Sequence, residues 1–179
     1  MNIELESMAI EMPRVAGHPN REPFRGVLTL VDAISDKPPA GARGHRVLLT
    51  RAAAEAGLPS LLGMGLDYAP SLDRHDARRK VGVITQAEIV GKNLELAGYL
   101  FAKDFPEIVR EIGRSRARFR DLSALSARLG MSYEIADARV ADVHSQVWTL
   151  THVVFTGAAI LRRDKAAYRD TWIELGKSS

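Results

Sequence analysis

Two runs of alternating apolar and polar residues flank the segment "VGKN" and constrain the fold more than any other feature of the sequence. Together they form the stretch "KVGVITQAEIVGKNLELAGYLF" over residues 80–101. A period of two places the apolar side chains on one face of a strand, and a short Gly-containing break joins two antiparallel strands. The pattern therefore predicts a β-hairpin and, with it, a fold built around a β-sheet.

The rest of the chain predicts further strands near both ends and helices between and after them. Strands are expected over 24–34, 131–143 and 146–161. Helices are expected over 50–69, 104–120 and 164–175. Thr50 and Asp164 are N-cap candidates, Pro106 suits a first helical turn, and Gly57 and Pro59 are expected to split the first helix. This arrangement favours an α+β domain in which an antiparallel β-barrel is surrounded by helices.

Length and composition limit the organisation of the chain and its chemistry. With 179 residues and 46% hydrophobic content, we expect one domain over 1–179, with an extended N-terminal segment over 1–23. The absence of cysteine excludes disulfides and thiolate chemistry, and we expect neither a cofactor nor a metal. The apolar stretches are too short to span a membrane, and the start "MNIELES" does not resemble a signal peptide. We therefore expect an intracellular protein that does not bind membranes.

The net charge of +3 and the isoelectric point near 9.4 raise the question of nucleic-acid binding. Basic residues cluster in "GRSRARFR", but Phe119 is the single aromatic residue in this cluster. Nucleic-acid surfaces usually interleave several aromatic side chains with the basic ones. We therefore interpret the basic end of the 104–120 helix as a face for an acidic scaffold protein and keep nucleic-acid binding as an alternative. This face consists of Arg114, Arg116, Arg118 and Arg120.

Three polar residues are candidates for catalysis. In "VWTLTHVVFTG", the period of two places His152 in line with Trp148 and Leu150. Burying an imidazole without a partner costs about 1 to 3 kcal/mol, so we expect His152 to be hydrogen-bonded. Ser132 begins a predicted strand, and His75 precedes the hairpin. A serine hydroxyl is an effective nucleophile when a base takes its proton and a third group orients that base, so the three residues together suggest nucleophilic catalysis.

The order of these motifs resembles the prohead proteases of tailed bacteriophages, which are serine proteases of capsid maturation related in fold to the herpesvirus assemblins. The resemblance rests on a histidine before "KVGVIT", followed by "LGMSYEI" and then "VWTLTHVVFTGAAI", and it extends over residues 24–168. It implies a herpesvirus-protease-like fold. It also implies a triad in which Ser132 is the nucleophile, His75 the general base and His152 the third member.

The third member departs from the phage pattern. Many phage members have a carboxylate where this chain has His152, whereas the assemblins use a second histidine. A neutral His152 would orient His75 but would stabilise an imidazolium less than a carboxylate does. The carboxylates near the motifs are Asp76, Asp137 and Asp142, so the third member stays open between His152 and a carboxylate.

The resemblance also bears on the oxyanion that forms during peptide hydrolysis. Assemblins place an arginine pair after the strand that carries the third triad member. Arg162 and Arg163 occupy a comparable place in "AAILRRDKAAY". The resemblance implies them as oxyanion candidates, through a backbone N–H held there and a guanidinium that acts through water. The alternative is that they are two surface arginines at the start of the predicted 164–175 helix.

The function implied by the resemblance is that of a serine endopeptidase. Its substrates would be the scaffolding protein, the major capsid protein and the enzyme itself, inside an assembling procapsid in the host cytoplasm. The 104–120 helix could mediate a homodimer, and a scaffold segment could follow residue 179. The alternative is a non-catalytic capsid- or scaffold-binding module of the same fold. The cleavage-site sequence stays open, because the substrate pockets depend on loops such as 35–46.

Overall fold

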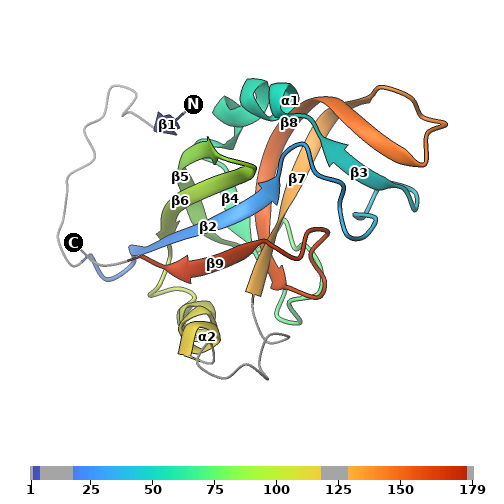
Figure 1. Cartoon of the computed structure of the whole chain (residues 1–179). Helices are drawn as coiled ribbons and strands as arrows, with labels where there is room; N and C mark the ends of the chain where they lie inside the picture. Colours follow the sequence, from blue (N-terminus) through green and yellow to red (C-terminus); the bar gives the residue numbers. More distant parts are fainter. Residues whose placement is uncertain (1, 5–17, 118–128, 177–179) are drawn as a thin grey trace.

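A computed structural model describes residues 2–4, 18–117 and 129–176 of the chain (Figure 1). Its strands are β1 (Asn2–Glu4), β2 (Glu22–Leu30), β3 (Arg46–Leu49), β4 (Gly65–Asp67), β5 (Lys80–Val90), β6 (Asn93–Leu100), β7 (Leu129–Val140), β8 (Val147–Arg162) and β9 (Trp172–Leu175). Its helices are α1 (Arg51–Gly57), the 3-10 helix η1 (Leu58–Leu61) and α2 (Pro106–Ala117).

The β5–β6 hairpin lies at the centre of the sheet, and it confirms the hairpin predicted over 80–101. Its turn consists of Gly91 and Lys92, and Gly91 has a φ of 59°, a left-handed conformation that glycine adopts at little cost. β2 pairs antiparallel with β6, and β9 pairs antiparallel with β2. On the other side of the hairpin, β5 pairs with β4, β4 with β8, and β8 with β3.

The sheet curls into an open barrel, so the predicted α+β class is confirmed (Figure 1). Two of its pairings, β3–β8 and β4–β8, are parallel, which makes the sheet mixed. β7 pairs antiparallel with β8, and it also contacts β2. A Cβ at Gly26 of β2 would lie 2.8 Å from the sulfur of Met131 and 2.3 Å from the carbonyl oxygen of Trp172. A glycine at this position therefore lets β7 and β9 pack against β2.

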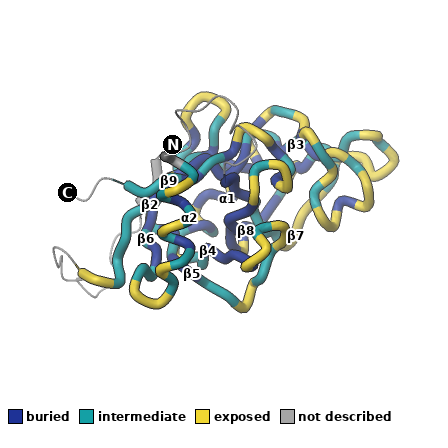
Figure 2. The backbone as a smooth tube through the Cα atoms, turned by 90° about the horizontal axis from the view of Figure 1, so that it is seen from below, coloured by how far each residue is buried: buried dark blue, intermediate teal, exposed yellow. Residues whose placement is uncertain are grey.

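The core fills the inside of the curled sheet. Figure 2 shows the buried backbone in dark blue along the strands, with the exposed segments at the turns and loop tips. The largest fully buried side chains include Phe24, Leu49, Ile84, Leu94 and Phe155. Because these residues come from five different strands, the core joins both ends of the chain and fixes the walls on which the site is built.

The first predicted helix is confirmed in its first half. The Thr50 side chain accepts a hydrogen bond of 3.2 Å from the Ala53 N–H, as expected for an N-cap. α1 ends at Gly57, and η1 follows with Pro59 in its first turn. The predicted split into two helical pieces is thus confirmed, but the part of the prediction after Leu61 is wrong, because Gly63 turns the chain with a φ of 80°. The next residues then form β4, whose backbone groups pair with β5 and β8.

The predicted closing helix over 164–175 is also wrong, because this segment contains turns followed by β9. The Thr171 hydroxyl donates to the Tyr168 carbonyl at 2.9 Å and accepts the Met131 N–H at 3.1 Å. Residues Trp172 and Ile173 then pair with β2. The segment "DKAAYRDTWIEL" has helical periodicity. Its aromatic and β-branched residues nevertheless pair with the free edge of β2, because tertiary pairing overrides a weak helix propensity.

The amphipathic helix predicted over 104–120 forms as α2, with Ile108 and Ile112 buried against the sheet. It packs beside β9 (Figure 1). Glu107 in its first turn accepts hydrogen bonds from the Tyr68 hydroxyl (2.5 Å) and from Arg79 (3.0 Å), which attaches α2 to the β4 and β5 region. Of the basic face, Arg118, Arg120 and the side chain of Arg116 lie outside the described residues. No helix of the described part is long and apolar enough to cross a membrane.

Candidate active site

The side chains of His75 and Glu134 are in contact beside β7. The Nδ1 of His75 is hydrogen-bonded to Oε1 of Glu134 at 3.1 Å. His75 belongs to the loop between β4 and β5, and Glu134 lies on β7. Both side chains are partly shielded, with 28% of His75 and 20% of Glu134 exposed. A carboxylate at Nδ1 fixes the orientation of the ring and leaves Nε2 free to act on a neighbouring group.

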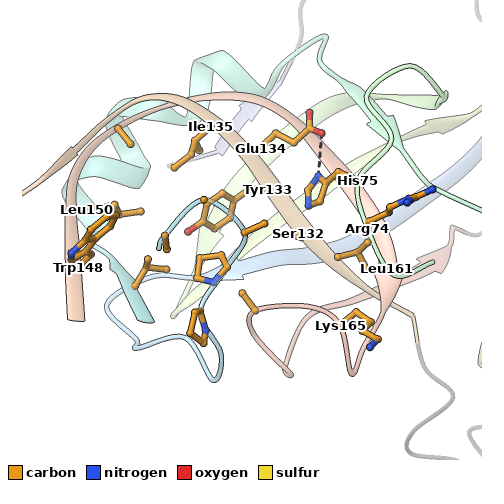
Figure 3. A pocket seen from close by; sticks show the side chains of 18 of the residues that line it. Arg74, His75, Ser132, Tyr133, Glu134, Ile135, Trp148, Leu150, Leu161 and Lys165 are labelled. Carbon is orange, nitrogen blue, oxygen red and sulfur yellow. Dashed lines mark hydrogen bonds and ion pairs between the residues drawn. The ribbon is translucent and has the colours of Figure 1, made fainter. Parts of the chain in front are cut away.

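Ser132 lies on the same strand as Glu134, two residues earlier. Side chains two residues apart on a strand point to the same side, so β7 presents the hydroxyl and the carboxylate together. Figure 3 shows Ser132 and His75 on the same wall of the pocket, with the Glu134 hydrogen bond on the far side of the ring. The strand pairs with β8 in this region, Ser132 opposite Ala159 and Glu134 opposite Gly157.

A pocket of about 750 Å³ adjoins these residues, and its lining includes Ser132, His75 and Glu134 (Figure 3). The loop between β2 and β3 forms one wall through residues 38–42. Apolar side chains continue the lining away from Ser132, among them Trp148 and Leu150. The pocket is therefore apolar at one end and carries a hydroxyl and an imidazole at the other, which is the composition of a ligand- or substrate-binding site.

The loop over 35–46, whose conformation the sequence left open, is held in place by hydrogen bonds. Ser35 is buried, and its hydroxyl accepts the Val47 N–H at 3.0 Å. The N–H groups of Asp36 and Lys37 donate to the Ala167 carbonyl at 2.9 and 3.2 Å. This wall of the pocket is therefore tied to β3 and to the segment before β9.

A second layer of charged groups lies behind the His75–Glu134 pair. Asp67, at the end of β4, is fully buried, and its Oδ2 is 3.1 Å from the Nζ of Lys80. The same Nζ lies 3.6 Å from Oε2 of Glu134. The ligand atoms of Asp67, His75 and Glu134 lie within 4.8 Å of one another, which is a spacing that could suit a metal ion. Because the Lys80 ammonium contacts both carboxylates, it supplies the positive charge that a metal would bring.

The two carboxyl groups have opposite pKa shifts. Burial raises the pKa of Asp67 despite the Asp76 N–H and Lys80, and the neighbouring Glu134 raises it further. Burial also acts to raise the pKa of Glu134, but hydrogen bonds with Asp67 and His75 and the charge of Lys80 lower it overall. Glu134 is therefore the carboxyl that stays ionised beside His75.

Gly157 provides the space for the Glu134 carboxylate. A Cβ at this position would lie 2.6 Å from Oε2 of Glu134 and 3.4 Å from the Nζ of Lys80. Because Gly157 stands opposite Glu134 in the β7–β8 ladder, any side chain on the same face would compete with the carboxylate for this place.

The structure does not bring His152 to His75. His152 stands opposite Arg139 in the β7–β8 ladder, whereas Ser132 stands opposite Ala159, and the seven residue steps from His152 to Ala159 span roughly 23 Å of strand. The ring is half-buried and forms no hydrogen bond or ion pair with any described residue. The β7–β8 ladder is irregular here, and the buried neighbours are Val153 and Phe155. The expected hydrogen bond of His152 is therefore wrong for the described residues.

None of the three carboxylates weighed from the sequence is hydrogen-bonded to the His75 ring. The side chain of Asp76 accepts the Arg78 N–H at 3.2 Å, and that of Asp142 accepts the His144 N–H at 2.8 Å. Asp137 is exposed in a bulge of β7, with a φ of 52°. The carboxylate at His75 is Glu134, which the sequence reasoning missed. The signal for it is the order "SYE", because a strand places residues i and i+2 on one face.

The arginine pair does not line the pocket. Arg162 is exposed, and its guanidinium forms an ion pair of 3.2 Å with Asp164. The backbone N–H of Arg162 donates to the Leu72 carbonyl. Arg163 forms an ion pair of 3.2 Å with Asp170. Both guanidinium groups are thus held by acidic residues of the turn after β8.

The positive side chains that do line the pocket are Arg74 and Lys165. They lie at the same end as Ser132 and His75, away from the apolar end (Figure 3). Arg74 immediately precedes His75 in the β4–β5 loop, and Lys165 follows the end of β8. This end of the pocket is therefore the positively charged one.

No protein-family model and no curated protein sequence matches the chain. Among solved structures, the chain is similar to Kaposi's sarcoma-associated herpesvirus protease in complex with a hexapeptide phosphonate inhibitor, with a TM-score of 0.52 and 13% sequence identity. The match covers 87% of this chain and 65% of that chain, so this chain spans less than two thirds of that structure's length. A structure of the same protease with a dimer disruptor gives a TM-score of 0.45 at 15% identity, and covers 88% of this chain and 77% of that one. The similarity confirms the herpesvirus-protease-like fold predicted from the sequence.

Proposed function

We propose that the chain is a serine endopeptidase in which Ser132 is the nucleophile, His75 the general base and Glu134 the carboxylate that orients His75. The observation that carries the proposal is the hydrogen bond of 3.1 Å between Nδ1 of His75 and Glu134, with Ser132 on the same face of β7 and in the same pocket. We call these three residues the Ser-His-Glu group. It keeps two members of the triad expected from the sequence and replaces His152 by Glu134.

In the proposed reaction, Oγ of Ser132 attacks the peptide carbonyl while Nε2 of His75 takes the hydroxyl proton. The imidazolium that forms is stabilised by the ionised Glu134 beside Nδ1. The proton passes from His75 to the leaving amine as the C–N bond breaks, which leaves an acyl-enzyme on Ser132. Water then hydrolyses this ester, with His75 again acting as the base. Arg74 and Lys165 are the proposed source of positive charge for the oxyanion.

The proposed substrates are the scaffolding protein and the major capsid protein of a tailed bacteriophage, and the enzyme itself, within the procapsid in the host cytoplasm. Support comes from the resemblance in motif order to prohead proteases and from the herpesvirus-protease-like fold. The pocket, open and largely apolar beyond Ser132, suits an extended peptide segment. Homodimer formation through α2 belongs to the same proposal.

The proposed activity is tested with fluorescein-labelled casein as a general substrate and, for specificity, with the scaffolding and major capsid proteins of the same phage. Wild-type protein should release casein fragments and cut both phage proteins. Ser132→Ala and His75→Ala should reduce cleavage by several orders of magnitude while the far-UV circular dichroism spectrum is unchanged. A folded wild-type protein that cuts none of these substrates would favour the alternative, a non-catalytic capsid- or scaffold-binding module.

A further inference from the structure

The buried Asp67 carboxylate contacts the loop that carries His75 and the lysine that reaches Glu134. Its Oδ1 accepts the Asp76 N–H at 3.0 Å, one residue after His75, so it holds the loop that carries the imidazole. Its Oδ2 accepts from the Nζ of Lys80 at 3.1 Å. Asp67 and Lys80 also stand opposite each other in the β4–β5 ladder, so the backbone pairing fixes the distance between them.

Lys80 connects this buried carboxylate to Glu134. Its Nζ is 3.6 Å from Oε2 of Glu134, while Oε1 of Glu134 is hydrogen-bonded to His75. Each carboxylate oxygen of Glu134 thus has a partner of its own, which fixes the plane of the group. The Lys80 stem runs over Gly65, where a Cβ would lie 2.6 Å from the Cδ of Lys80. The absence of a side chain at residue 65 therefore gives the lysine room to reach Glu134.

We propose that Asp67 and Lys80 are positioning residues of the Ser-His-Glu group, with Asp67 holding the His75 loop and Lys80 holding the carboxylate of Glu134. This inference rests on the proposed function and extends it to two residues that do not line the pocket. A buried carboxylate contributes little to stability, because desolvation offsets the attraction of its partners. Burial raises the pKa of Asp67, so desolvation outweighs the stabilising Asp76 N–H and Lys80 here. Positioning His75 and Glu134 therefore explains the buried Asp67–Lys80 ion pair better than a contribution to stability does.

The test uses a fluorophosphonate probe, which modifies an activated serine without a need for a known substrate. The inactivation rate at saturating probe and the half-saturating probe concentration are measured separately, as functions of pH, for wild type and for Lys80→Met and Lys80→Arg. The matched control is Lys92→Met, which removes an exposed lysine from the β5–β6 turn. The double variant Asp67→Asn/Lys80→Met removes both charges, so that no unpaired charge is left buried and folding is kept.

We expect Lys80→Met and the double variant to lower the saturating rate by about 10- to 100-fold, the range typical for residues that orient a reacting group. The half-saturating concentration should change by less than about twofold, because neither residue lines the pocket. Lys80→Arg should recover most of the rate, and Lys92→Met should match wild type. A double variant that is folded and reacts at the wild-type rate would overturn the proposal.

A second readout separates this proposal from the proposed function. In protein with ¹⁵N-labelled histidine, the hydrogen-bonded Nδ1 proton of His75 should give a downfield signal, assigned by its loss in His75→Ala. The signal should persist in Lys80→Arg and weaken or vanish in Lys80→Met and the double variant. If wild type fails to react with the probe, the proposed function fails, and the signal alone then tests positioning. An unchanged signal in the double variant refutes the positioning role whether or not the protein is an enzyme.

Discussion

Replacing Glu134 by glutamine removes the charge beside His75 and keeps the shape of the side chain. The protonated imidazole of the transition state lies about 3.1 Å from the carboxylate oxygen, where two unit charges attract by about 5 kcal/mol at an effective dielectric constant of about 20. His75 and Glu134 are 28% and 20% exposed, and we halve the attraction for solvent screening. About 2.5 to 3 kcal/mol corresponds to a loss of about 100-fold in kcat. Lys80 would then face the imidazolium without its counter-charge, so the loss should reach about 100- to 1,000-fold.

The assay for Glu134→Gln is casein cleavage at neutral pH, with circular dichroism and thermal unfolding to verify the fold. His152→Gln is the matched control, because it places the same side chain at the position expected from the motif order. It should retain the wild-type rate, since the structure does not bring His152 to His75. The opposite result, a fully active Glu134→Gln and an impaired His152→Gln, would refute the assignment of Glu134 and restore His152 as the third member.

Three further predictions follow from the geometry of the site and the sheet. Gly157→Ala should lower kcat by about 10-fold or more, because the new Cβ would lie 2.6 Å from the Glu134 carboxylate; casein kinetics that match wild type would contradict this. The pKa of Glu134 is lowered in the folded protein, so its stabilising contribution is present above the ordinary glutamate pKa of about 4.3 and is lost as the pH falls through the lower folded value. As the pH falls from 7 to 3, the free energy of unfolding measured in urea should therefore decrease more for wild type than for Glu134→Gln. An equal decrease in the two proteins would contradict the lowered pKa of Glu134. Gly98→Ala should prevent folding, because its Cβ would lie 2.0 Å from the Val83 carbonyl oxygen, and soluble protein with the wild-type melting temperature would show that the β5–β6 pairing tolerates it.

The parts of the fold that the sequence predicts are those with strong local signals. The hairpin over 80–101 has two alternating runs and a glycine turn, and Thr50 and Pro59 mark the start of α1 and the break after it. The segment over 164–175 has helix-forming residues, yet it completes the edge of the sheet beside β2. β4 is a three-residue strand whose pairing depends on β5 and β8. Such tertiary pairing leaves no mark in a short stretch of sequence.

The same contrast between local sequence signals and tertiary pairing applies to the site. Ser132 and His75 were predicted from their order relative to the strands, and the structure places both at one pocket. The third residue depended on the register between β7 and β8, which changes by one residue at each of three irregularities in the two strands. A strand shifted in this way changes which side chain of β8 faces the pocket. Glu134 avoids the difficulty because it shares a strand with Ser132, and its position relative to the serine is set by the two-residue period alone.

The most direct test of the Ser-His-Glu group is to identify the residue that a fluorophosphonate probe modifies. Wild-type protein is incubated with the probe, digested and analysed by tandem mass spectrometry. The phosphonyl group should be found on Ser132, and labelling should be abolished in His75→Ala and strongly slowed in Glu134→Gln. Labelling of a different residue, or labelling of Ser132 at the same rate when His75 and Glu134 are both replaced, would contradict the account.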